Sequence, residues 1–170
     1  MRTPPIHPDP AAAILDAVRD HYQRRALPVP DLRSVRFLKI REIEGILFHV
    51  IDYMEGPAMN MFWLAYAQQA PDGKWGGGLS CGGGWHPSVP IPDTPYARTC
   101  GGTEVRGGRI EDPDRLVSVA RLLSNRLVVA EDIIDNEAVL FTIPADIRHQ
   151  PLTSVDLFDK SGTRLQSCPL

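Results

Sequence analysis

Residues 35–53, VRFLKIREIEGILFHVIDY, decide the class of fold. Two runs rich in β-branched and aromatic residues, Val35–Ile43 and Ile46–Tyr53, meet at the dipeptide Glu44-Gly45. Two such runs around a short connection that contains glycine are typical of a β-hairpin. Helical periodicity does not continue into this stretch, so we expect a fold built mainly from antiparallel strands.

Further strand signals follow this hairpin. Residues 61–68 are apolar on both faces, which is typical of a central strand that is buried on both sides. Pro71-Asp72-Gly73 predicts a turn, after which Trp75 begins a short returning strand. Five later runs have strand character: 116–123, 127–134, 138–143, 154–158 and 163–166. Short strands separated by regular turns indicate a sandwich or barrel, and we predict a mainly β fold, an antiparallel β-sandwich with one N-terminal α-helix.

The helix is predicted at about residues 11–25. Asp9 and Pro10 suit the N-cap and the first helical position, and Pro28 and Pro30 end the segment. One face is apolar, with side chains at helical spacing: Ala11, Ile14, Leu15, Val18 and Tyr22.

This apolar face must dock somewhere, because a helix of about 15 residues is marginal alone in water. The expected place is an open face or end of the sandwich. The alternative is the same helix of a second copy, which would give a homodimer. We therefore expect residues 1–33 to form a Pro-rich lead-in and helical arm, and residues 34–170 to form a single β-sandwich domain.

A Gly/Pro-rich segment at residues 76–103 is expected to be a long loop. It contains three runs of consecutive glycines and four prolines between Pro87 and Pro95. A long loop in a compact domain is often functional. The candidate binding residues are the rings in and beside it: Trp75, Trp85, His86 and Tyr96. The alternative is that the aromatic rings pack over the glycine backbone and cover the core.

Cys81 and Cys100 bracket this segment and allow several chemistries. A disulfide between them would require an oxidising compartment. With His86 they could instead hold a zinc ion or supply a thiol nucleophile, although no C-x-x-C pair supports a metal site. Two free thiols are the remaining alternative. No cofactor is expected.

Two other residues invite a functional interpretation. Ser80 lies in a G-x-S-x-G match at residues 78–82, but a hydrolase elbow needs a helix after the serine, and glycines and prolines follow here. His49 shares its strand parity with Ile51 and Tyr53. We therefore expect a core or half-buried histidine whose hydrogen bonds are satisfied.

The C-terminal part of the chain contains RLLSNRLVVAEDIIDNEAVLFTIP at residues 121–144 and LTSVDLFDKSGTRL at residues 152–165. On these runs, about residues 108–165 resemble immunoglobulin-like and fibronectin-III-like β-sandwich modules of uncharacterised bacterial proteins. The Cys-Trp-Cys core pattern of antibody domains is missing. The resemblance implies a scaffold and no particular activity, because one fold hosts many functions.

Composition reduces the number of possible partners and locations. A net charge of −3 without a run of basic residues argues against nucleic acid and membrane surfaces as partners. The first residues lack the apolar region of a signal peptide, so a cytoplasmic location is expected, or the cell envelope if the natural chain starts upstream. We expect a non-enzymatic binding or interaction module for an unidentified protein or small ligand. The alternatives are a thiol- or metal-dependent enzyme using Cys81, His86 and Cys100, and a structural envelope protein with a Cys81–Cys100 disulfide.

Overall fold

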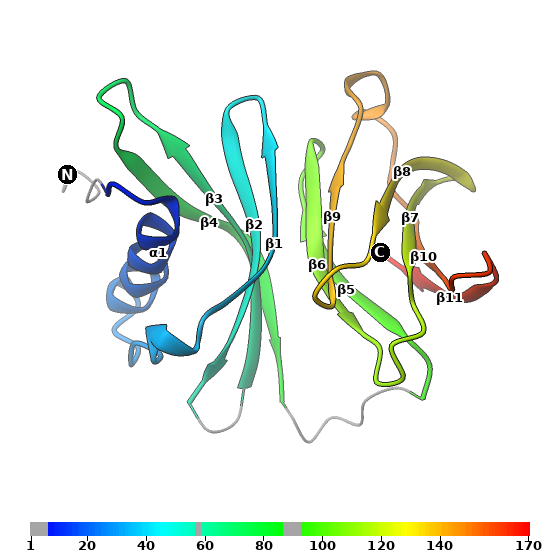
Figure 1. Cartoon of the computed structure of the whole chain (residues 1–170), viewed down its shortest axis with the longest axis horizontal. Helices are drawn as coiled ribbons and strands as arrows, with labels where there is room; N and C mark the ends of the chain where they lie inside the picture. The colour runs from blue at the N-terminus through cyan, green and yellow to red at the C-terminus, as the bar shows by residue number, and fades with distance from the viewer. Residues whose placement is uncertain (1–6, 57–58, 87–92) are drawn as a thin grey trace. The chain divides into compact units, whose positions relative to one another are not determined.

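The structure, a computed structural model, describes residues 7–56, 59–86 and 93–170. In these residues the chain is mainly β, with one α-helix and antiparallel strands, which confirms the predicted fold class (Figure 1). None of the described helices is long and apolar enough to span a bilayer. The chain divides into two compact units, Met1–Pro87 and Ser88–Leu170. This division differs from the predicted boundary after residue 33, because the helix belongs to the same unit as the first four strands.

The first unit is a helix packed on a four-stranded sheet. Helix α1 (Pro10–Arg24) begins as predicted, with the Asp9 carboxylate accepting a 2.8 Å hydrogen bond from the Ala11 amide. The sheet is antiparallel and follows sequence order: β1 (Arg36–Ile43), β2 (Ile46–Glu55), β3 (Met59–Gln69) and β4 (Trp75–Trp85). A 3₁₀ turn, η1 (Leu32–Ser34), leads into β1.

The apolar face of α1 docks on this sheet, mainly over β3 and β4. The core beneath it combines residues of the helix and of two strands: Ile14, Val18, Tyr22, Ile51, Tyr53, Ala65 and Ala67. The face is therefore used within the chain. A homodimer stays a prediction and would need another surface.

Local sequence signals set the hairpin geometry of this sheet. Glu44 and Gly45 both have positive φ, 52° and 79°, as a two-residue turn with the right twist requires. The predicted hairpin is therefore confirmed. Strand β3 lies between β2 and β4, which confirms its predicted central place. The predicted burial of both faces is incomplete, because Tyr66 is exposed.

The loop predicted at residues 76–103 is wrong over most of its length. Strand β4 runs for 11 residues through both glycine triplets, and β5 (Tyr96–Gly101) follows. Residues 87–92 of the predicted loop lie outside the described residues.

Neighbouring groups stabilise β4 by covering its bare backbone. A Cβ atom on Gly77 would overlap the carbonyl of Ala13 in α1, and one on Gly82 would lie 2.6 Å from the indole of Trp63. Gly78 lies under the ring of Tyr66 in the same way. The glycines therefore permit close approach of the helix and of two rings, rather than marking turns.

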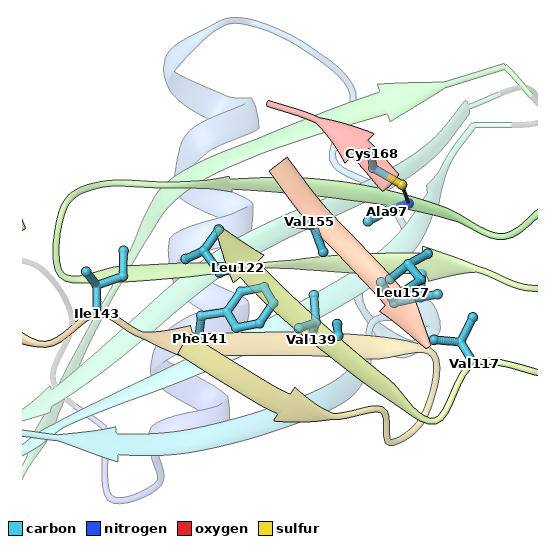
Figure 2. Close-up of a cluster of buried hydrophobic side chains, with 11 residues drawn as sticks. Ala97, Val117, Leu122, Val139, Phe141, Ile143, Val155, Leu157 and Cys168 are labelled. Atoms are coloured by element: carbon cyan, nitrogen blue, oxygen red, sulfur yellow. Dashed lines mark hydrogen bonds between the residues drawn. The ribbon is translucent and has the colours of Figure 1, made fainter. Parts of the chain in front are cut away.

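The second unit is a β-sandwich. Its described part holds sheets of four strands (order β11-β10-β7-β8) and three strands (order β5-β6-β9). The strands after β5 are β6 (Val105–Glu111), β7 (Val119–Ser124), β8 (Leu127–Ile133), β9 (Ala138–Thr142), β10 (Ser154–Phe158) and β11 (Arg164–Pro169). Figure 2 shows the core between them, to which β9 contributes Val139 and Phe141. The resemblance to immunoglobulin-like modules stays a prediction.

Candidate functional site

The predicted aromatic binding residues do not form one cluster. Trp75 and Trp85 are the first and last residues of β4, so their Cα atoms are about 33 Å apart at the usual rise of a strand. Trp75 packs against the core of the first unit, and the Trp85 ring lies 6.4 Å from that of Phe62. Tyr96 belongs to the second unit and packs against its core. No binding loop of exposed rings is therefore built from the two tryptophans.

The proposed thiol and metal chemistry has no geometry to support it in the first unit. Cys81 and His86 are five residues apart in extended chain, roughly 16 Å, which is too far to share a metal or a proton. The described residues contain no group of three His, Cys, Asp or Glu side chains that could hold a metal ion. Cys100 lies in β5 of the second unit, and its disulfide with Cys81 stays a prediction.

Two further side chains from the sequence analysis behave differently from expectation. Ser80 is an exposed residue in the middle of β4 rather than a nucleophile on a strand-to-helix turn. His49 is buried as predicted, at 5% exposure, but it is not satisfied. Neither of its ring nitrogens has a hydrogen-bond partner, and burial lowers the pKa of the imidazole to about 4.

The second unit contains an arginine that points inward. In the ladder of β6, Arg106 lies opposite Phe141 of β9 and Gly101 of β5. Residues directly opposite each other in a sheet share a face, and Phe141 is a fully buried core residue. Arg106 therefore extends from the inner face of the sandwich, where charged residues are rare unless they are paired.

Few polar contacts compensate for the desolvation of the Arg106 guanidinium. Its Nη1 donates a 3.3 Å hydrogen bond to Thr99 Oγ1, and its buried Nε has no partner. No carboxylate of the described residues pairs with it. Desolvation lowers the pKa of the guanidinium, yet an arginine stays protonated at neutral pH. A permanent charge thus lies half-buried without a counter-ion.

Other arginines of the same unit show how unusual this is. Arg98 pairs with Glu111 at 2.8 Å, and Arg109 donates to Glu137 at 2.8 Å. A carboxylate partner is therefore the rule for half-buried arginines in this unit, and Arg106 is the exception among them.

A cavity of about 320 Å³ lies beside Arg106 at one end of the sandwich, and we call it the Arg106 cavity. One wall is the backbone of Gly101 and Gly102 in the turn between β5 and β6. The remaining walls combine polar residues (Thr103, Arg106, Arg148, Gln150) with apolar ones (Ile143, Ile147, Leu152). All of these residues belong to the second unit.

The two arginines of the Arg106 cavity differ in whether a carboxylate neutralises their charge. Arg148 donates to Glu104 at 3.0 Å and to the carbonyl of Ile143 at 3.2 Å. Its charge is therefore neutralised. The charge of Arg106 remains, so the cavity carries an excess of about one positive charge.

A second groove lies between α1 and β4 in the first unit, also about 320 Å³ in volume. Both carboxylates that line it have a partner: His7 contacts Asp16 at 2.8 Å, and Arg24 contacts Asp20 at 3.4 Å. The His21 ring stacks edge-on against Trp63, 4.7 Å away. Arg25 also lines this groove but is exposed to solvent, so its charge needs no partner, and the groove indicates no missing ligand.

Sequence reasoning missed the Arg106 cavity, although one signal was present. Arg106 has the same strand parity as Ile110, and a correct strand assignment over VRGGRIE would have placed an arginine on the core face. Comparison of the chain with protein-family models, curated proteins and solved structures finds no match.

Proposed function

We propose that the protein is a non-enzymatic binding module that holds a small anion in the Arg106 cavity. The observation that carries this proposal is the half-buried guanidinium of Arg106, which faces the inside of the sandwich without a carboxylate partner. An uncompensated charge in such a place destabilises the fold. Local rules are commonly broken in this way at functional sites, and a bound anion would supply the missing partner.

The chemistry of the cavity favours binding over catalysis. Its described lining residues include no His, Cys, Asp or Glu. The side chains that most often act as general bases or activated nucleophiles are thus missing from its wall. What the wall offers is a positive charge, two neutral polar groups and three apolar side chains, which is the make-up of a small-ligand pocket.

The proposal is tested by titrating the ¹⁵N-labelled protein with small anions and following amide shifts. We expect saturable shifts in Gly101, Gly102 and Gln150. Arg106→Gln should weaken this binding at least tenfold. Arg126→Gln removes the same charge from an exposed turn and should leave it unchanged. If acetate, 3-methylbutanoate, succinate and phosphate all leave these amides unmoved, the proposed function is wrong.

A further inference from the structure

Resting on this proposed function, we infer that the ligand of the Arg106 cavity is a small monocarboxylate with a compact apolar group. Three properties of the cavity select this class: its charge, the donors of Arg106, and the division of its wall into polar and apolar parts.

The charge selects a monoanion. Glu104 already neutralises Arg148, so the cavity has one positive charge to offer. A dianion such as succinate or hydrogen phosphate would bring a second negative charge into a partly desolvated space without a partner. That second charge would carry a desolvation penalty which a monocarboxylate avoids.

The donors of Arg106 favour an anion that presents two oxygens side by side. Only Nη1 donates to the protein, so the edge formed by Nε and Nη2 has no acceptor in the described residues. This edge of a guanidinium matches two oxygens of a carboxylate or of a phosphate in a bidentate pair, and the preference for a single negative charge then selects the carboxylate. Lysine would supply the charge but not this planar fork.

The apolar wall selects a short hydrocarbon group. Ile147 and Leu152 pack against the sandwich core, and Ile143 is itself part of that core. These side chains line the cavity together with the two arginines, so an acid bound to Arg106 would have its hydrocarbon part beside them. A volume of about 320 Å³ is at the small end for ligand pockets, which suits a short hydrocarbon group.

The test is calorimetry with five probes: 3-methylbutanoate, its neutral amide, acetate, succinate and phosphate. We expect 3-methylbutanoate to bind at least tenfold more tightly than each of the others. Equal affinity for the amide would overturn the role of the charge. Equal or tighter binding of succinate or phosphate would overturn the ligand class, while the proposed anion site would stand. No binding by any probe would remove both.

Two variants separate the contributions of fork and wall. Arg106→Lys should weaken 3-methylbutanoate about tenfold, because the charge stays and only the bidentate pair is lost. Ile147→Ala should weaken 3-methylbutanoate several-fold and leave acetate unchanged. Arg126→Gln is the matched control and should alter none of these affinities. An Ile147→Ala protein that retains full affinity for 3-methylbutanoate, with a native spectrum, would contradict the apolar wall.

Discussion

His49 in the first unit and Arg106 in the second are both polar side chains that lack partners, yet they mean different things. His49 is 5% exposed and has no hydrogen bond to either ring nitrogen. Arg106 faces the sandwich interior with only Thr99 as an acceptor. The difference between them is whether the side chain can lose its charge.

An imidazole can release its proton when it is buried. The pKa of His49 falls to about 4, so the ring is neutral at pH 7 and the remaining penalty is two unsatisfied nitrogens. A guanidinium does not deprotonate in proteins. Arg106 must therefore carry its charge at every physiological pH, and only a counter-ion can relieve it. Burial of His49 therefore affects only the stability of the fold, whereas an inward arginine without a counter-ion indicates a ligand.

The largest expected effect comes from placing a permanent positive charge at position 49. His49→Arg should destabilise the first unit by about 3–5 kcal/mol, because it leaves a charge buried without a partner. His49→Met, a neutral side chain of similar volume, should fold. Urea unfolding followed by tryptophan fluorescence measures this, since Trp63, Trp75 and Trp85 all belong to the first unit. An arginine variant as stable as the methionine variant would show that the position is not desolvated.

Lowering the pH should reveal the cost of charging the buried His49 in the natural chain. The pKa of His49 is lower in the folded protein than the unfolded value of about 6.5, so the unfolded state binds more protons between the two values. Stability is therefore fully present above pH 6.5 and is lost as the pH falls towards 4. The expected loss is on the order of 2–3 kcal/mol.

His49→Met provides the control for this measurement. Burial, with Arg25 and Arg24 next, also lowers the pKa of His21, so a shallower acid dependence should persist in the variant. Urea midpoints at pH 7, 5.5 and 4 give the comparison. Parallel pH profiles for the natural chain and His49→Met would contradict the assignment to His49.

The contrast also shows what sequence can and cannot predict. The turn at Glu44-Gly45 was predictable because two-residue hairpins require positive φ, which glycine supplies. The burial of His49 followed from strand parity. Its lack of partners did not, because hydrogen bonding depends on side chains from other strands.

Glycine caused the main error. In β4, Gly77 and Gly82 are needed because a helix and an indole lie against the backbone, a tertiary cause that no local pattern expresses. In β6, Gly107 and Gly108 weaken the strand pattern, so the strand and the inward direction of Arg106 could not be predicted. The candidate site was therefore missed because its strand was missed.

A smaller effect should appear when the charge of Arg106 is removed. Arg106→Met keeps an unbranched apolar side chain about as long as the aliphatic stem of arginine and eliminates a desolvated charge, so the ligand-free second unit should gain roughly 1 kcal/mol. Hydrogen exchange of the β6 and β9 amides in buffer without organic anions measures this gain. Arg126→Met, in an exposed turn, should leave exchange unchanged. A clear loss of protection in Arg106→Met would mean that Arg106 stabilises the fold rather than a ligand.

The smallest expected effect comes from replacing Arg106 by a histidine, which can lose its charge as His49 does. In Arg106→His the new imidazole can deprotonate, and burial should hold its pKa below the usual value of about 6.5. Binding of 3-methylbutanoate should then be weak and confined to about pH 5–6, where the ring is charged and the acid is still ionised. The natural chain should bind equally well from about pH 6 to 8, since its guanidinium does not titrate there and the acid is fully ionised. Titrations at three pH values decide the matter, because pH-independent binding by the histidine variant would mean that the charge at this position does not hold the ligand.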